Sequence, residues 1–534
     1  MKSYQLFLLS LLSALLLAFG WFPHGFVPLL FIAFVPLLMV ENAVFRNPGK
    51  YHPLTLIACT YLSFFLWNVL TTWWIKNASL GGAAMAIICN ALLMTFTFIL
   101  FHNTRKRLDE KWRSLVFISF WLTFEFLHHD WDLTWTWLTL GNAFADVPGW
   151  IQWYEYTGVF GGSLWVLIIN CFVFTGISKL EAFNKQAVLK LVKSKAPALL
   201  ALLVVPVGLS YLILATSSGL TNSVNAVIVQ PNIDPYNEKF VSDYEEQLQK
   251  MLKLAAEKAD STTDYVIFPE TALTENLWEN QLKQSSSIHI LKEFLKAYPK
   301  MKIIVGASTA KVYEPGEQLS ATARKFTQQD GFYDSYNTAI QLDSSNNIQL
   351  YHKSRLVPGV EKMPFPFIFK YLDKLAIDMG GTTGSLGTQD ERTVFTSGND
   401  SVKAAPVICY ESVYGEFVSD YIRAGASFIA IITNDGWWGD TPGYKQHLKY
   451  GTLRAIETRR YIARSANTGI SCVITDKGEI QQASSWWTPD AIKAKIYLNN
   501  TLTFYTKYGD FIARFTMYLS FALIAYSLFL RFKR

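Results

Sequence analysis

Eight runs of apolar residues divide this chain of 534 residues. Each run is long enough, or nearly long enough, to cross a bilayer as a helix, which takes about 20 residues. The runs cover residues 4–20, 26–40, 53–75, 80–101, 115–127, 159–177, 196–216 and 511–530. The second and fifth are short, which leaves a tilted or re-entrant element open at both places. We predict an integral membrane α-helical bundle of about eight transmembrane helices.

The first run also has features of a cleavable signal peptide, because a lysine and a stretch of leucines follow Met1. A cleavage site needs small residues, whereas this run ends in Phe-Gly-Trp-Phe at 19–22. We therefore expect it to remain as a helix.

Composition agrees with a membrane protein. Hydrophobic residues make up 51% of the chain and charged residues 17%, against about 25% charged in soluble domains. The formal net charge of +6 favours a nucleic-acid partner only where basic residues cluster on a folded face, and here they lie between and after the apolar runs. None of the five cysteines forms a Cys-x-x-Cys pair. We expect no nucleic acid, disulfide framework, metal or cofactor.

The basic residues also indicate topology, because cytoplasmic loops carry an excess of Lys and Arg. Alternate loops differ in this way. One set of loops, with both chain ends, holds Lys2, Arg46, Lys50, Arg105, Lys106, Arg107, Lys111, Arg113, Lys179, Lys185, Lys190, Lys193, Lys195, Arg531, Lys533 and Arg534. The opposite loop at 129–158 has no Lys or Arg. We predict that both termini are cytoplasmic and that residues 218–508 lie outside the cytoplasmic membrane.

Two features of the membrane region leave alternatives open. The loop at 129–158 is rich in tryptophan, which is typical of an interfacial aromatic belt and is also compatible with lipid binding. Glu125 lies within the fifth run, where a carboxylate is costly. It either has a function there or reaches the membrane surface from the nearby segment end.

From residue 225 onward, short β-rich runs alternate with amphipathic stretches, which indicates α/β layers. We expect strands at 225–230, 265–268, 302–307, 337–342, 348–352, 402–409, 428–433, 469–475 and 491–498. We expect helices at 238–258, 288–297 and 443–464, and loops at 313–335 and 380–399. The predicted domains are a membrane domain at 1–217 with about seven helices, an extramembrane α/β domain at 218–508, and a last helix with a basic tail at 509–534.

Three ionisable side chains stand at, or just after, the end of an expected strand. They are Glu270, Lys353 and Cys409. Strand ends in an α/β sheet converge on one edge, so these groups can meet there. Singly, each has a structural explanation: an acid at a helix start, a solvated loop charge and a buried core thiol. Together they favour Cys409 as a nucleophile activated by the other two.

The segments around these residues resemble the nitrilase (carbon–nitrogen hydrolase) superfamily. The resemblance rests on Phe-Pro-Glu270, on His-Lys353 with Glu361 following, on Cys409-Tyr410-Glu411, and on Thr-Asn-Asp-Gly-Trp-Trp-Gly-Asp at 433–440. Within this superfamily, an α/β domain placed between a bundle of membrane helices and one last helix is similar to the apolipoprotein N-acyltransferases.

This resemblance implies a nitrilase-like αββα sandwich with a Glu270, Lys353 and Cys409 triad. The implied reaction moves an acyl chain from a phospholipid, through a Cys409 thioester, to the N-terminal amine of a diacylglyceryl-cysteine apolipoprotein. Glu270 acts as the base, and Lys353 stabilises the thiolate and the oxyanion. The implied location is a bacterial inner membrane with the catalytic domain in the periplasm, and we expect a monomer.

Supporting residues follow from the same resemblance. Glu361, Tyr410 and Glu411 match positions around the triad in the family. The family commonly shows Phe-Gly-Glu after Val-Pro, whereas this chain has Gly359, a valine and Glu361, and Phe240 stands where a tryptophan is usual.

Trp437 and Trp438 are aromatic residues beside the Asn-Asp-Gly segment. They either cover an acyl chain or form a structural pair, and the Asp-Gly turn itself requires no function.

Two other functions stay open. A membrane-tethered amidase that acts on a small extracytoplasmic amide uses the same three residues, although eight helices and an aromatic rim favour a lipid substrate. The second open function is that of a transporter or a non-catalytic scaffold. The apolar runs hold few ionisable groups besides Glu125 and show no obvious pair of broken helices, which argues against transport.

Overall fold

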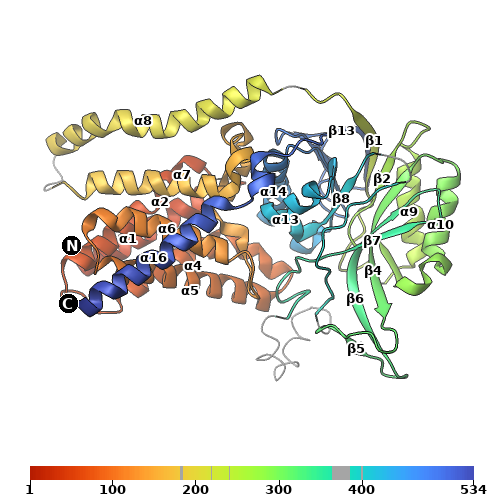
Figure 1. The fold of residues 1–534 in the computed structure, drawn as a ribbon, viewed down its shortest axis with the longest axis horizontal. Coiled ribbons are helices and arrows are strands. Elements are labelled where there is room, and N and C mark those ends of the chain that lie inside the picture. The colour runs from red at the N-terminus through yellow and green to blue at the C-terminus, as the bar shows by residue number, and fades with distance from the viewer. Residues whose placement is uncertain are drawn as a thin grey trace. The chain divides into compact units, whose positions relative to one another are not determined.

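The computed structural model describes residues 1–533 except 24, 181–184, 218, 240, 364–384 and 398–400. The chain forms two compact units (Figure 1). The helical unit comprises Met1–Lys76, Ala83–Ser217 and Tyr508–Arg534, and the α/β unit comprises Asn77–Gly82 and Ser218–Lys507.

Long helices build the helical unit. They are α1 (Ser3–Phe19), α2 (Leu30–Ala33), α3 (Val35–Arg46), α4 (Thr55–Thr72), α5 (Leu80–Arg105), α6 (Arg113–Leu127), α7 (Tyr154–Ile177), α8 (Lys185–Thr216) and α16 (Phe511–Lys533). Within the described residues, six segments are long and apolar enough to cross a membrane: Val27–Arg46, Thr55–Asn77, Leu80–Arg105, Tyr154–Ile177, Leu189–Thr216 and Phe511–Phe532. The other two predicted segments form α1 and α6, which have 17 and 15 residues.

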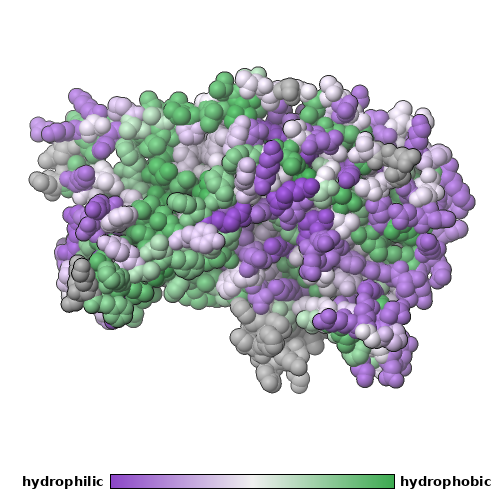
Figure 2. Space-filling model, in the orientation of Figure 1, coloured by the Kyte–Doolittle hydropathy of each residue, from purple (hydrophilic) through white to green (hydrophobic). Residues whose placement is uncertain are grey.

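Aromatic side chains fill the interior of the helical unit. Phe34 from the turn between α2 and α3 packs edge-on against Trp121 of α6, with ring centroids 4.7 Å apart, and Phe64 of α4 lies 5.4 Å from the same ring. The outer surface is also largely hydrophobic (Figure 2), and exposed side chains such as Phe96 and Phe515 contribute to it. Because water does not tolerate so large an apolar surface, this unit is built for a bilayer, and the chain is a membrane protein.

Glu125 and part of the tryptophan-rich loop are buried in the structure. Glu125 is 3% exposed and accepts hydrogen bonds from the Trp121 indole at 3.0 Å and the Leu140 backbone N–H at 2.9 Å. It is therefore enclosed within the helical unit, where it fastens the following loop to α6. Trp137 and Trp153 of that loop are buried as well. An interfacial belt does not describe these two rings.

The α/β unit contains two sheets. Its strands are β1 (Ser223–Gln230), β2 (Tyr265–Ile267), β3 (Leu273–Trp278), β4 (Lys302–Val312), β5 (Arg324–Lys325), β6 (Phe332–Leu342), β7 (Ile348–His352), β8 (Ala404–Ile408), β9 (Phe428–Thr433), β10 (Ile462–Ala466), β11 (Cys472–Ile474), β12 (Ile480–Gln481) and β13 (Asp490–Tyr497). The eight-stranded sheet runs β13-β1-β2-β4-β6-β5, with β3 on β4 and β7 on β6. The five-stranded sheet runs β12-β11-β10-β9-β8.

The sheets pack face to face between helices, as the predicted αββα sandwich requires (Figure 1). Ser465 of β10 donates to the Val229 carbonyl of β1 at 2.7 Å, and this hydrogen bond joins the two sheets. Helices α9 (Tyr244–Ala256) and α10 (Ser286–Lys296) cover the outer face of the larger sheet. Helices α13 (Gly415–Arg423) and α14 (Pro442–Thr458) accompany the smaller sheet.

Periodicity explains why α9 and α10 bind the sheet. Leu248, Met251, Leu252 and Ala255 recur at helical spacing on α9 and are buried against strand residues such as Val227. Removing this apolar stripe from water stabilises the sandwich by about 1.5–3 kcal/mol for each large side chain.

Two predicted helices have different bounds in the structure. The helix expected at 238–258 begins only at Tyr244, because the Asp243 side chain caps it by accepting from the Glu245 N–H at 2.7 Å. The helix expected at 443–464 ends at Thr458, where Arg459 adopts a left-handed conformation with φ 51°. The next residues form β10, which pairs in parallel with β9.

Strand β3 was not predicted, and part of the expected loop at 313–335 belongs to β5 and β6. Of the expected loop at 380–399, residues 380–384 and 398–399 lie outside the described residues.

Candidate active site

Glu270 lies on a bend after β2 and is 6% exposed. Its Oε1 accepts hydrogen bonds from Asn337 Nδ2 at 2.8 Å and Lys353 Nζ at 3.0 Å. Its Oε2 accepts from the backbone N–H of Asn434 at 3.1 Å. Burial favours the neutral acid, but the Lys353 ammonium and these hydrogen bonds hold the pKa of Glu270 below its ordinary value. The carboxylate is therefore ionised before any substrate binds.

Lys353 directly follows β7, and its side chain is buried between two carboxylates. Its Nζ lies 3.0 Å from Glu270 Oε1 and 2.9 Å from Glu361 Oε1. Burial alone lowers a lysine pKa, yet these two negative charges raise the pKa of Lys353 well above its ordinary value. The Lys353 amine is therefore held as a cation that points at the Glu270 carboxylate.

Cys409 is the first residue after β8 and opens the 3-10 turn η9 (Cys409–Val413). Its φ of 50° is left-handed, a conformation that costs about 1–3 kcal/mol for a residue with a side chain. Burial and the Glu270 charge raise the pKa of its thiol far above the ordinary value, and the Lys353 charge opposes this. The resting group is thus a neutral thiol beside an ionised carboxylate, which is the arrangement that proton transfer from sulfur to oxygen requires.

Glu361 contacts Lys353 and Asn337, although the glycine before it stands one position earlier than in the common family pattern. Its Oε1 accepts from Lys353 Nζ at 2.9 Å and Asn337 Nδ2 at 3.1 Å, and its Oε2 accepts from the Val357 N–H at 2.9 Å. Gly359 takes φ 79° in the turn between Val357 and Glu361. This conformation, which glycine adopts readily, lets the loop turn so that the Glu361 carboxylate reaches Lys353.

Glu411 is fully buried and joins the two strand ends that carry Cys409 and Lys353. It accepts hydrogen bonds from the Tyr351 hydroxyl and the Ser354 N–H, both at 2.7 Å, and from the Ile408 N–H at 2.8 Å. Burial raises the pKa of this carboxyl, and its hydrogen bonds oppose the rise.

Three aromatic candidates, Tyr410, Trp437 and Trp438, each pack against another ring. Tyr410 is buried with its ring edge-on to Tyr414, 5.3 Å between centroids. Trp437 and Trp438 end the turn η10 (Asp435–Trp438) and are half-buried. The Trp437 ring lies 5.3 Å from Tyr236, and the Trp438 ring lies 5.5 Å edge-on to His447. Phe240 lies outside the described residues.

Three further residues contact this site that the sequence did not single out: Asn337, Lys239 and His447. Asn337 lies inside β6, where no sequence signal marks it. Lys239 precedes α9, and its Nζ binds the Thr271 hydroxyl and the Glu270 carbonyl. Burial lowers the pKa of Lys239 to about 8, and the charge of Glu270 opposes this.

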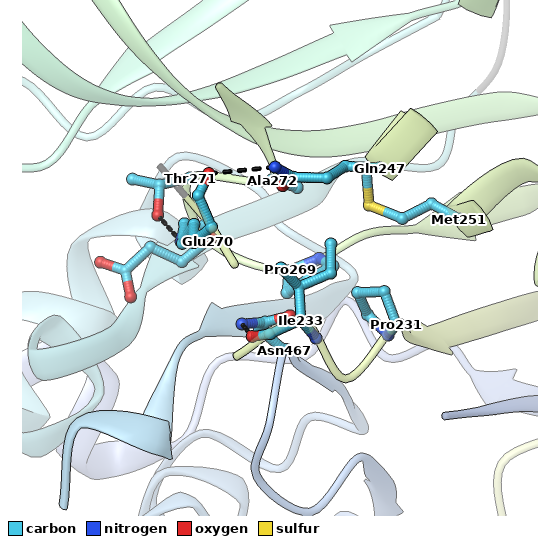
Figure 3. Close-up of a pocket in the computed structure, with 10 residues that line it drawn as sticks. Pro231, Ile233, Gln247, Met251, Pro269, Glu270, Thr271, Ala272 and Asn467 are labelled. Carbon is cyan, nitrogen blue, oxygen red and sulfur yellow. Dashed lines mark hydrogen bonds between the residues drawn. The ribbon is translucent and has the colours of Figure 1, made fainter. Parts of the chain in front are cut away.

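A small recess lies beside Glu270 (Figure 3). Lys239 is one of the residues that line it. Its other lining residues include Pro231, Met251 and Pro269. Figure 3 shows the Glu270 carboxylate turned away from Pro231 and Met251. The acid therefore presents its oxygens to Lys353 and not to this recess.

A second feature of the site is the absence of a metal-binding cluster. Across the described part of the chain, no three His, Cys, Asp or Glu side chains are grouped so as to hold a metal ion.

Two family models match the chain. Residues 225–503 match the carbon-nitrogen hydrolase family, and residues 13–172 match the apolipoprotein N-acyltransferase N-terminal domain. The chain belongs to the carbon-nitrogen hydrolase family. Its helical unit carries the additional domain of the apolipoprotein N-acyltransferases, so the resemblance inferred from the motifs is confirmed.

Full-length relatives bear this out. An apolipoprotein N-acyltransferase of Chlorobaculum tepidum is 28% identical over 522 residues, which cover 95% of this chain and 93% of the relative. Apolipoprotein N-acyltransferase 2 of Treponema denticola is 26% identical over 565 residues, which cover 100% of this chain and 99% of the relative. A solved structure of a nitrilase-superfamily amidase from Nesterenkonia is 13% identical and has a TM-score of 0.36, over 56% of this chain and 99% of that chain. The chain is thus an enzyme homologue in the acyltransferase branch of the family.

Proposed function

We propose that this chain N-acylates diacylglyceryl-cysteine apolipoproteins, the last step of lipoprotein maturation, with a phospholipid as acyl donor. The observation that carries the proposal is the buried Glu270–Lys353 ion pair beside the Cys409 thiol. The names of the full-length relatives supply the reaction class.

The first half-reaction loads the enzyme. Glu270 takes the proton of the Cys409 thiol, and the thiolate attacks the ester carbonyl carbon of the phospholipid. Lys353 stabilises the negative oxygen of the tetrahedral intermediate. The carbon–oxygen bond then breaks, and protonated Glu270 gives its proton to the departing lysophospholipid alkoxide. The products are a Cys409 thioester and a lysophospholipid.

The second half-reaction releases the acyl chain to the acceptor. The free N-terminal amine of the apolipoprotein attacks the thioester carbonyl, and Glu270 accepts the proton that the amine loses. The carbon–sulfur bond breaks, an amide forms, and the proton on Glu270 returns to the Cys409 sulfur. The enzyme is then restored without any further reactant.

The supporting residues divide between holding the charges and meeting the lipid. Glu361 and Glu411 hold Lys353 and the strand ends in place through the hydrogen bonds described above. We assign Tyr410, Trp437 and Trp438 to the walls that meet the acyl chain or the acceptor. Aromatic rings suit this role because they exclude water from the thioester.

The charge pattern and the membrane helices support a proposal for the location. We place the protein in a bacterial inner membrane as a monomer, with both termini in the cytoplasm and the α/β unit in the periplasm. A donor phospholipid reaches the enzyme from the bilayer itself.

Burst kinetics test the proposal. Phospholipid alone should load Cys409 once and release one lysophospholipid per enzyme, because the thioester waits for an amine. A diacylglyceryl-cysteine peptide with a free N-terminus should restart turnover, whereas the N-acetylated peptide should not. Mass spectrometry of the intact protein measures the adduct, and Cys409→Ser, which lacks an ionisable thiol, should neither load nor turn over.

Two results contradict the proposal. Continuous release of fatty acid from phospholipid at the rate seen with peptide would identify a lipid hydrolase. Turnover of a small amide, with no loading by phospholipid, would identify the membrane-tethered amidase.

A further inference from the structure

The strained Cys409 conformation is held at its carbonyl oxygen. The Ser412 hydroxyl donates to this oxygen at 2.7 Å from within the same turn. The His447 Nε2 lies 3.1 Å from it and comes from α14, a separate element. A left-handed residue with a side chain persists only where its surroundings fix it, and these two donors act on the peptide unit that follows the Cys409 Cα.

The neighbours of His447 show that its Nε2 carries a hydrogen. A carbonyl oxygen only accepts, so Nε2 carries the hydrogen in the bond to Cys409. Nε2 also lies 3.1 Å from Ser412 Oγ, which uses its own hydrogen on the same carbonyl. Nδ1 lies 2.9 Å from Asp435 Oδ1 and 3.3 Å from Arg464 Nη2. The ring is fully enclosed, with both nitrogens in contact with fixed groups.

Asp435 is anchored in turn. Arg464 of β10 donates to its Oδ2 at 2.6 Å, and the Thr433 hydroxyl of β9 donates to its Oδ1 at 2.8 Å. Burial favours the neutral acid, but Arg464 and His447 hold the pKa of Asp435 well below its ordinary value. The carboxylate therefore stays charged and keeps the His447 ring oriented.

We propose that His447 is a positioning residue for the nucleophile. Arg464 fixes Asp435, and Asp435 fixes the orientation of the His447 imidazole. The Nε2–H of His447 then holds the Cys409 carbonyl, so that the Cys409 thiol remains within reach of Glu270 and Lys353. This inference rests on the proposed function in taking Cys409 as the attacking group. Through these hydrogen bonds, residues of β9, β10 and α14 hold the end of β8 in place.

A matched pair of amides tests this role. In His447→Gln the side-chain amide nitrogen falls near the position of Nε2 and can still donate to Cys409. In His447→Asn the amide reaches only the position of Nδ1, so it keeps the Asp435 contact and loses the Cys409 contact. The purified full-length protein is assayed in detergent for the rate and concentration dependence of acyl loading from phospholipid.

His447→Asn should lower the maximal rate constant for loading on the order of 10²-fold, because small misplacement of a reacting atom has effects of this size. The phospholipid concentration that gives half of this maximal rate should change little, since no lipid contact is removed. His447→Gln should recover much of the loss. The rate of Cys409 alkylation by iodoacetamide should follow the same order without any substrate. Thr458→Val, which removes a buried hydroxyl elsewhere on α14, serves as the control and should behave as the wild type.

Equal loading rates in the Gln and Asn variants would overturn the inference and leave His447 as a core residue. If neither variant folds, Ser412→Ala removes the second donor to the same carbonyl and should lower the maximal rate constant for loading without changing the half-saturating phospholipid concentration. A wild-type rate constant in Ser412→Ala would also overturn the inference. Cys409→Ser distinguishes a failure of this inference from a failure of the proposed function. If Cys409→Ser still transfers the acyl chain, the proposed function is wrong. If Cys409→Ser loses transfer while His447→Gln and His447→Asn load at equal rates, only the role of His447 is wrong.

Discussion

Glu270 owes its charge to three hydrogen-bond donors, one of which is the buried Lys353 cation, and not to solvent. Asn337, Lys353 and the Asn434 backbone all donate to its two oxygens. The same negative charge raises the pKa of the Cys409 thiol. The acid therefore suppresses the resting thiolate while it stands ready to accept the thiol proton, and these two effects can be separated by substitution.

Glu270→Gln should separate them, because glutamine keeps the size of the side chain and loses the charge. Acyl transfer should fall by about 10²- to 10⁴-fold, the usual contribution of a general base. Alkylation of Cys409 should nevertheless begin at lower pH than in the wild type, since removal of a neighbouring negative charge lowers the thiol pKa. A pH series of iodoacetamide rates, with Glu257→Gln as an exposed control, measures this. Alkylation that shifts to higher pH would show that Glu270 does not act on the thiol through its charge.

The sequence singled out Glu270, Lys353 and Cys409 as candidates because each stands at, or just after, a strand end, and position along a strand is visible in the chain. Asn337, Lys239 and His447 carry no such mark. Asn337 lies within a strand, Lys239 within a segment expected to be helical, and His447 within a helix. Each reaches the site only through packing of elements that are distant in sequence, and local patterns do not encode that packing.

Strand β4 fixes the bend that presents Glu270. Gly306 of β4 donates its N–H to the Pro269 carbonyl at 3.0 Å, so the strand lies directly against this bend. A Cβ at position 306 would meet Thr271 N at 2.5 Å and Glu270 Cα at 2.6 Å. Both are backbone atoms that cannot turn aside, so glycine is required here for close approach.

Gly306→Ala should consequently move the bend and the Glu270 carboxylate with it. We expect a loss of about 1–3 kcal/mol in the free energy of unfolding, as overpacking commonly gives. The larger effect should be on the maximal rate constant for loading, on the order of 10²-fold. Gly219→Ala, with no atom within 4 Å of the added Cβ, is the matched control. A wild-type loading rate constant in a folded Gly306→Ala protein would show that the bend tolerates displacement.

Element boundaries were predictable where apolar periodicity was strong. The strands at 348–352 and 428–433 have the predicted bounds. The helix expected at 443–464 failed at its end, because Arg459 turns left-handed and the apolar residues after it join a sheet instead of continuing the helix. Such a switch depends on the neighbouring strand β9, which the local pattern cannot report.

At the scale of the molecule, a helical unit with apolar outer surfaces and an α/β unit with a buried charged site perform different tasks. In the reaction proposed above, the acyl donor is a lipid and the thioester carries a fatty acyl chain, so the helical unit serves access to the bilayer and the α/β unit serves the chemistry. The side of the membrane on which the α/β unit lies then decides which acceptor amines it meets.

Impermeant thiol labelling decides that side. Four natural cysteines are buried and Cys89 is partly buried, so background labelling should be low. Asn346→Cys, exposed on the loop between β6 and β7, should react with a membrane-impermeant maleimide in intact spheroplasts. Asn47→Cys, exposed between Arg46 and Lys50, should react only after permeabilisation, because Lys- and Arg-rich loops stay in the cytoplasm. Both variants should label fully in detergent, which checks that each cysteine is reachable. The opposite pattern in spheroplasts would place the α/β unit in the cytoplasm, away from secreted apolipoproteins, and would contradict the proposed acceptor.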